Sequence, residues 1–479
     1  MTITRREFVK SAATVASALA LEGGKALLGE ETPAPKPNVV FVFADQWRAQ
    51  ACGYVGDPNA RTPNLDRLAA QSVNFVNAVS GCPVCSPYRA SLLTGRYPQT
   101  HGVFINDVPL GTQAVSIAQA FGGAGYDTGY IGKWHVDGHG RSSFIPRERR
   151  QGFDFWRVLE CTHAYNNSAY YGDENVKKFW DGYDSIAQTR EAQGYIRQHT
   201  AGKPFLLMLS WGPPHDPYQT APEKYRAMFP PEKIVLRPNV PPEMQRLARQ
   251  MLSGYYAHQA ALDDCIGELL ATLKETGLEK NTIFVFTSDH GDMLGSHGQT
   301  HKQRPWDEAL RVPFLLRYPG ALGEKDKTLS SPIDAPDILP TLLGLCRVDI
   351  PKTAEGMDLS GLIRGDTAQE KDAALLSCMQ PFGQWTRAQG GREYRGLRTK
   401  THTYIRDLKG PWLLFDNQKD PYQQNNLCNA PDQAAQQKEL DDLLTAKLKD
   451  RGDEFLPGEK YLEKWGYKVD KNGTMPYTN

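Results

Sequence analysis

The run Cys85-Ser-Pro-Tyr-Arg89 is the part of this sequence that predicts chemistry most specifically. Together with Cys82 it has the C-x-x-C spacing of a redox pair, of half a zinc site, or of two structural thiols. No second C-x-x-C pair follows in the chain, which argues against zinc. Only Cys85 has a proline two positions and an arginine four positions after it, and a redox pair needs neither. By spacing alone, two structural thiols are the most common case, and the redox pair stays an alternative. The proline and the arginine are what set Cys85 apart from Cys82.

Polar side chains follow four predicted strands, close to the point where each strand ends. Asp45, Lys133, His215 and Asp289 come after apolar, strand-like runs of the kind buried inside a parallel sheet. Open α/β sheets carry their sites at the carboxyl ends of the strands, so we expect these four side chains to converge. The predicted strands span residues 38–44, 125–132, 204–210 and 282–287.

Two carboxylates in this set predict a metal site. Asp45-Gln46 and Asp289-His290 each stand at the end of a strand. Carboxylate and amide oxygens suit a hard cation such as Ca²⁺ or Mg²⁺, whereas the imidazole is a less hard ligand. The residues alone leave the identity of the metal open.

The sequence from Asn38 to about Leu427 resembles the sulfatase family that uses formylglycine, within the alkaline-phosphatase-like superfamily. The resemblance rests on the run that begins at Cys85 and continues to Leu92-Leu-Thr-Gly-Arg96, and on three further stretches. Tyr88 stands where the family usually has Ser, Ala or Thr, and Gln423 replaces an expected Glu in a C-terminal turn. The further stretches are Gly132-Lys-Trp-His135, Thr287-Ser-Asp-His-Gly-Asp-Met-Leu-Gly-Ser-His297 and His301-Lys-Gln-Arg-Pro-Trp-Asp-Glu-Ala-Leu-Arg-Val-Pro313.

This resemblance implies a role for each candidate residue. Cys85 would be oxidised to formylglycine, whose hydrate attacks sulfur and also coordinates the metal. The metal would be Ca²⁺, with Mg²⁺ as an alternative. Arg89 would orient the hydrate, and Lys133 and Lys302 would bind sulfuryl oxygens. His135 would accept the proton in the breakdown step, and His215 would protonate the leaving oxygen. The metal ligands would be Asp45, Gln46, Cys85, Asp289 and His290.

The expected activity is hydrolysis of sulfate esters, on a sulfated carbohydrate or a small sulfate ester. A phosphodiester or phosphonate monoester hydrolase of the same superfamily is the first alternative, and a thiol–disulfide oxidoreductase using Cys82 and Cys85 is the second. A catalytically silent carbohydrate-binding relative finds no support, because every expected site residue is present. Candidate substrate-binding stretches are residues 137–141, 160–171 and 384–395, with Trp385, Arg387 and Arg392 as candidates for stacking and ion pairing.

The order of elements predicts an α/β fold, in which a mostly parallel central sheet is sandwiched by helices. Helical patterns cover residues 62–72 and 244–275, and a helix is expected to begin near the nucleophile. We predict a catalytic domain over residues 38–372 and a smaller C-terminal α+β subdomain, built on an antiparallel sheet, over residues 373–479. In the latter we expect an exposed strand over 394–404, a strand over 412–416, and a surface helix over 433–451 capped by Asp432.

The N-terminus resembles a twin-arginine export signal over residues 1–31, with paired Arg5 and Arg6 ahead of a short, mildly apolar stretch. A Pro-rich linker follows over residues 32–37. We therefore expect export to the periplasm or beyond, through the twin-arginine translocase, after a maturation enzyme has acted. A disordered basic tail is the alternative interpretation.

Charge, hydropathy and cysteine content argue against nucleic-acid binding, a membrane span and a disulfide framework. Formal net charge is zero, which gives no electrostatic case for nucleic acid. No segment reaches transmembrane length. Eight cysteines become seven if Cys85 is oxidised, which does not resemble a disulfide framework, although one bridge is compatible with the sequence.

Overall fold

The computed structural model of the protein describes residues 35–199 and 202–477. The described residues from Pro37 onward form one compact unit. The predicted export signal and the first three residues of the predicted linker lie outside the described residues. The predicted division near residue 372 stays a prediction.

An eight-stranded sheet forms the centre of the fold, in the order β11-β2-β10-β9-β1-β8-β4-β5. Within this sheet β10 is antiparallel to both of its neighbours, and the other neighbouring strands are parallel. The predicted mostly parallel α/β fold is confirmed. The strands are β1 (Asn38–Asp45), β2 (Val73–Phe75), β4 (Asp127–Lys133), β5 (Phe155–Leu159), β8 (Phe205–Pro214), β9 (Thr282–Ser288), β10 (Phe314–Arg317) and β11 (Lys327–Leu329).

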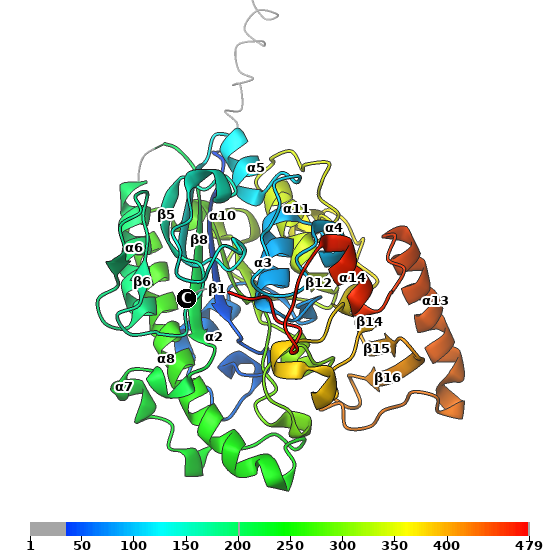
Figure 1. Ribbon diagram of the computed structural model, residues 1–479. Helices are drawn as coiled ribbons and strands as arrows, with labels where there is room; N and C mark the ends of the chain where they lie inside the picture. The colour runs from blue at the N-terminus through cyan, green and yellow to red at the C-terminus, as the bar shows by residue number, and fades with distance from the viewer. Residues whose placement is uncertain (1–34, 200–201, 478–479) are drawn as a thin grey trace, which may run out of the picture. The chain divides into compact units, whose positions relative to one another are not determined.

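Helices cover both faces of this sheet, which explains why β1 is apolar along almost its whole length (Figure 1). Successive strand side chains point to opposite faces. Phe41 and Phe43 pack with α3 (Cys85–Thr94), α5 (Ile117–Gly123) and α11 (Ala335–Leu345). Val40 and Val42 point to the other face of the sheet, where they pack against three helices. The three helices are α2 (Pro63–Ala69), α6 (Asp184–Gln198) and α8 (Gln245–Glu275).

A four-stranded antiparallel sheet, β13-β14-β15-β16, forms the C-terminal part. On one face it packs against leucines of α13 (Ala434–Asp450), which recur every fourth residue at 440, 444 and 448. On the other face it packs against Val79 and Leu310 from the first 372 residues. The strands are β13 (Ala374–Cys378), β14 (Tyr394–Arg398), β15 (His402–Asp407) and β16 (Gly410–Asp416).

Two predictions for this C-terminal part are wrong. Residues 394–404 are not one exposed strand, because a turn at residues 399–401 divides them between β14 and β15. All five residues of β14 are buried, because the sheet is covered on both faces. Asp432 does not cap α13. Gln433 occupies the cap position, and the Asp432 carboxylate accepts a hydrogen bond from its side chain.

The remaining elements are short, apart from one helix of eight residues near the C-terminus, and connect these layers. Among the helices of the described residues, none combines the length and apolar character that crossing a bilayer requires. The short strands are β3 (Ala78–Val79), β6 (Ala169–Tyr170), β7 (Lys178–Phe179) and β12 (Ile333–Asp334). The helices are α4 (Pro98–His101), α7 (Glu223–Arg226), α9 (Asp307–Leu310), α10 (Pro319–Leu322), α12 (Ser360–Arg364) and α14 (Gly458–Trp465).

Candidate active site

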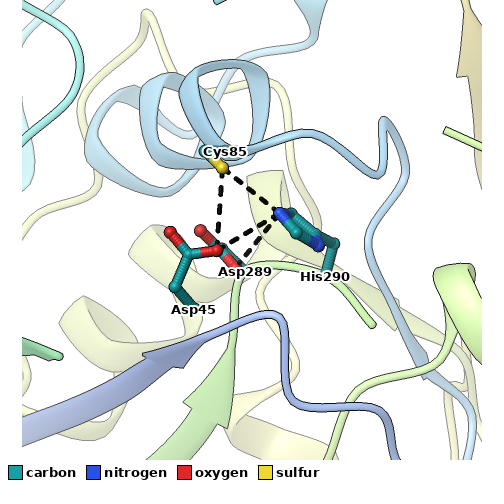
Figure 2. Close-up of side chains that lie close together, drawn as sticks. All are labelled: Asp45, Cys85, Asp289 and His290. Carbon is teal, nitrogen blue, oxygen red and sulfur yellow. Dashed lines mark hydrogen bonds and ion pairs between the residues drawn. The ribbon is translucent and has the colours of Figure 1, made fainter. Parts of the chain in front are cut away.

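Four buried side chains meet where β1 and β9 end and α3 begins (Figure 2). Asp45 is the last residue of β1, Asp289 and His290 follow β9, and Cys85 is the first residue of α3. One ligand atom from each lies within 4.8 Å of the others, and all four residues are at most 1% exposed. The predicted convergence of strand ends therefore produces a compact group of potential metal ligands.

In each of the two carboxylates, one oxygen contacts the Arg89 guanidinium and the other faces His290. Arg89 donates to Asp289 Oδ2 at 2.9 Å and to Asp45 Oδ2 at 3.3 Å. The Oδ1 atoms face His290 instead, with Nε2 3.4 Å from Asp45 and 3.6 Å from Asp289. The Cys85 sulfur lies 3.3 Å from the same Nε2. Arg89 thus fixes the carboxylates and leaves one oxygen of each directed at Cys85 and His290.

Two lysines flank the cysteine. Lys133 Nζ is 2.5 Å from Asp45 Oδ2 and 3.8 Å from Cys85 Sγ. Lys302 Nζ is 3.5 Å from the same sulfur and 2.6 Å from His215 Nε2. Both ammonium groups are nearly buried, so their charges act with little solvent screening.

The two cysteines of the C-x-x-C motif occupy different environments. Burial and the Asp45 charge would raise the pKa of the Cys85 thiol, but Lys133, Lys302 and His290 together hold it well below its usual value. Burial raises the pKa of Cys82 to about 12, and its neighbours are Arg395 and Ser377. The two thiols are not joined by a disulfide. This arrangement gives no support to a redox pair.

The His215 ring is held at both nitrogens and on one face. Nδ1 lies 2.9 Å from the Asp216 carbonyl oxygen, Nε2 lies against Lys302, and the ring of His163 stacks on it with centroids 4.8 Å apart. Burial lowers the pKa of His215 well below its usual value, and the Lys302 charge adds to this effect. In the resting site His215 is therefore a neutral ring that accepts from Lys302.

His135 depends on an aspartate that sequence reasoning missed. His135 Nε2 is 3.4 Å from Asp107 Oδ1, and Arg141 binds both oxygens of the same carboxylate, at 2.8 and 2.7 Å. Asn106, which directly precedes Asp107 in the chain, accepts a hydrogen bond from the backbone N–H of Ser86 in the first turn of α3. The adjacent Asn-Asp pair within the apolar run 103–110 was the available signal.

Gln46 lies beside the cluster with a left-handed backbone, at φ 73°. Its Oε1 is 3.2 Å from Lys302 Nζ, and its Nε2 donates to Asp292 at 2.7 Å. The structure thus brings every predicted catalytic and metal-binding residue to the same edge of the sheet, while their roles stay predictions.

A cleft of about 330 Å³ opens above Cys85. From the predicted substrate-binding stretches, Arg141, His163 and Gln384 line it. Trp385, Arg387 and Arg392 do not, because they are engaged elsewhere in the C-terminal part. Trp385 is buried against Tyr394, Arg387 pairs with Glu393 and Glu459, and Arg392 pairs with Asp407.

This geometry suits attack on an anionic ester. A nucleophile at Cys85 faces two ammonium groups that can bind ester oxygens, and three histidines, at 135, 163 and 215, border the same cleft. Cations that are already in position stabilise negative charge as it develops in a transition state.

Comparison with known proteins agrees with this geometry. A family model described as Sulfatase matches residues 37–348, and one described as N-sulphoglucosamine sulphohydrolase, C-terminal, matches residues 295–450. An ulvan-active sulfatase from Formosa agariphila is 48% identical, over 92% of this chain and 87% of its own length. A solved structure concerned with glycosaminoglycan metabolism in Bacteroides thetaiotaomicron is 30% identical, with a TM-score of 0.79, and covers 90% of this chain and 99% of its own.

A second solved structure, in complex with its substrate D-glucosamine-2-N,6-O-disulfate, is 25% identical with a TM-score of 0.75, and covers 89% of this chain and all of its own. The family model covers well over half of the sequence, and the Formosa relative matches nearly all of it. The chain therefore belongs to the sulfatase family and is a sulfuric ester hydrolase.

Proposed function

We propose that this protein hydrolyses sulfate esters on a sulfated carbohydrate, with a formylglycine made from Cys85 and a bound divalent cation. The observation that carries the proposal is the position of Cys85, between two lysines and against a buried pair of carboxylates. The ulvan-active relative supports a sulfated polysaccharide or its fragments as the substrate class.

The donor set fits a cation. His290 Nδ1 lies 2.9 Å from the Gly291 carbonyl oxygen, so Nδ1 donates there and Nε2, which faces Asp45 and Asp289, is the atom that would bind the ion. This is the usual way in which a second contact orients a ligating histidine. Asp45, Asp289 and His290 would hold the ion, together with Gln46 Oε1 and the modified Cys85. The oxygens favour Ca²⁺, with Mg²⁺ as the alternative. When bound, the ion would supply positive charge that favours ionisation of the nucleophile.

The chain's own side chains perform the remaining tasks in this proposal. Formylglycine would supply a hydrated aldehyde, one hydroxyl of which attacks sulfur while the other later expels sulfate. Lys133 and Lys302 bind sulfuryl oxygens, and Arg89 keeps both aspartates in position. His215 Nε2, which carries no proton in the resting site, takes one from Lys302 at 2.6 Å and passes it to the leaving oxygen. His135, fixed by Asp107, accepts the proton released when sulfate departs.

The proposal includes how the protein matures. An oxidising maturation enzyme would act on Cys85, and the twin-arginine translocase would then export the protein to the periplasm or beyond. The signal at Arg5-Arg6 and the run at Cys85 support this part.

The deciding experiment measures the mass of the peptide containing Cys85 after coexpression with a sulfatase-maturing enzyme. We expect formylglycine in place of the thiol, and turnover of 4-nitrophenyl sulfate and of ulvan oligosaccharides. A Cys85→Ala variant should fold and be inactive. An intact thiol in an active enzyme, or faster turnover of a phosphodiester than of any sulfate ester, would contradict the proposal.

Metal content provides a separate test. Elemental analysis of the purified protein should find about one Ca²⁺ or Mg²⁺ per chain, and chelation should abolish activity until that cation is restored. Asp289→Asn should lower the metal content. Full activity in metal-free protein would rule out the cation.

A further inference from the structure

The end of the described chain returns to the active site. After α14 the chain runs across the molecule toward the carboxyl ends of the central strands, as the red segment of Figure 1 shows. Thr474 and Tyr477 line the same cleft as Cys85. The two family models end at residues 348 and 450, so this wall of the cleft lies outside the part of the chain that they match.

This C-terminal segment is held by specific contacts. The Tyr467 hydroxyl donates to the Gly102 carbonyl at 3.1 Å, and Gly383 N donates to the Asn472 carbonyl at 2.9 Å. Asp470 Oδ1 accepts from the backbone N–H groups of Asn472 and Thr474, at 2.8 and 2.9 Å. The turn formed by these bonds fixes the direction in which residues 474–477 enter the cleft.

Tyr477 ends a series of contacts that reaches His135. The Arg141 guanidinium carbon lies 3.6 Å from the centre of the Tyr477 ring. Arg141 is in turn fixed by its two hydrogen bonds to Asp107, whose carboxylate also contacts His135. One face of the tyrosine ring therefore rests on a cation that two hydrogen bonds hold, while Tyr477 remains 42% exposed.

We propose that Tyr477 and Arg141 form a sugar-binding wall, which recognises the monosaccharide that carries the sulfate ester. An exposed aromatic ring at a cleft wall can pack against the apolar face of a pyranose. Asp107 neutralises Arg141, so the pair suits sugar hydroxyl groups, which both donate and accept. This inference rests on the proposed function and adds which residues select the sugar. Of the two residues, Tyr477 lies beyond the regions that the family models match, whereas Arg141 and the reacting groups lie within them.

The test compares two substrates on the matured enzyme. In 4-nitrophenyl sulfate the ester is on a flat aryl ring, whereas ulvan oligosaccharides carry it on a pyranose. Tyr477→Ala should raise KM for the oligosaccharides about fivefold to tenfold, as expected for loss of one aromatic packing contact. The KM for the aryl sulfate should change much less. Tyr477→Phe keeps the ring and should restore most of the affinity for the oligosaccharides.

Phe179→Ala serves as the matched control, because it removes another exposed aromatic ring, on β7, that does not line the cleft. It should leave the ratio of the two KM values unchanged. If Tyr477→Ala changed the KM for both substrates equally, or changed neither, the proposed sugar-binding wall would be wrong. It would also be wrong if the wild-type enzyme hydrolysed the aryl sulfate but none of the oligosaccharides. A wild-type enzyme inactive on both would instead refute the proposed function.

Discussion

Arg89 determines how charge is arranged around Cys85, because it contacts both buried aspartates. Besides Asp45 and Asp289, it donates to the Lys133 carbonyl at 2.8 Å and to Ser210 Oγ at 2.7 Å. Burial would lower its pKa, but the two carboxylates raise it above the usual value. A planar guanidinium can serve four acceptors at once, which a lysine ammonium cannot.

We therefore expect Arg89→Lys to keep the positive charge but to lose most of the hydrogen bonds that Arg89 donates. The free energy of unfolding should fall by about 3 kcal/mol, because the buried carboxylates lose partners that a lysine cannot replace. Urea unfolding of the two proteins measures this, and kcat should fall with it. Arg147→Lys is the matched control, since its pair with Asp154 is exposed on both sides and should contribute less than about 1 kcal/mol. Equal losses in the two variants would contradict this account of Arg89.

Glu160 provides a prediction about pH. Its Oε1 accepts from the backbone of Asp137 and Gly138, at 2.9 and 3.0 Å, while Oε2 is buried without a partner. Burial raises the pKa of Glu160 to about 7. A raised carboxyl pKa favours the folded state at low pH, and this contribution is lost as pH rises through the folded value.

Glu160→Gln should thus be stabilising at alkaline pH. The amide keeps the Oε1 acceptor and carries no charge, so its advantage over wild type should grow by about 2–3 kcal/mol between about pH 5 and about pH 8. Urea unfolding at both values gives the difference. An advantage that is constant with pH would mean that Glu160 does not titrate in this range.

At the scale of the elements, strand β4 must approach β8 closely to bring Lys133 into the site. Gly132 has φ +104°, and a Cβ there would lie 2.0 Å from the Ser210 carbonyl oxygen. Arg89 also donates to the side chain of Ser210. The close approach of Gly132 to Ser210 therefore positions both Lys133 and Arg89. A glycine directly before Lys133 is therefore required by the spacing of the strands.

Gly132→Ala should cost about 3 kcal/mol or more of stability and reduce kcat, because the strands must separate. Gly125→Ala is the matched control, since its φ is +89° but no atom lies within 4 Å of the added Cβ. Only the backbone strain of about 1–2 kcal/mol should then appear, with kcat near the wild-type value. Similar kcat values for the two variants would show that Lys133 tolerates the displacement.

At the scale of the whole molecule, the two sheets are joined by a buried ion pair as well as by apolar packing. Arg398 of β14 donates to Asp307 of α9, and both side chains are 4% exposed. Gln423 accepts from the Asp307 backbone N–H at 2.8 Å. The glutamine that replaces the expected Glu thus avoids a second buried carboxylate next to Asp307.

We expect Asp307→Asn to destabilise the whole protein by about 3 kcal/mol, because the Arg398 charge stays buried without a counterion. Asp442→Asn, which removes an exposed carboxylate on α13 opposite Lys438, should change stability by less than about 1 kcal/mol. Calorimetry of the three proteins makes the comparison. If Asp307→Asn unfolds like wild type, apolar contacts alone join the two sheets.

The sequence predicted the central strands and the group at their ends, because buried parallel strands have a strong apolar pattern and their ends converge. It could not predict Asp107 or Tyr477 as cleft residues. The pair Asn106-Asp107 stands out within its apolar run, but it does not identify His135 as a partner. Tyr477 arrives from a segment that is distant in sequence, so no local pattern indicates its contact. The exposed strand expected at 394–404 was wrong for a similar reason, since α13 covers that sheet from farther along the chain.

For the proposed maturation of Cys85, the burial of α3 decides when that step could take place. All ten residues of this helix are buried, and Arg89 is enclosed by Asp45, Asp289 and Ser210. A folded chain therefore offers no recognition sequence to another protein, even though the cleft reaches the sulfur of Cys85. In that proposal, an enzyme that reads Pro87 and Arg89 would have to meet the chain before the helix packs, in the interval between synthesis and folding. The rate of folding would then limit how much of the protein becomes active.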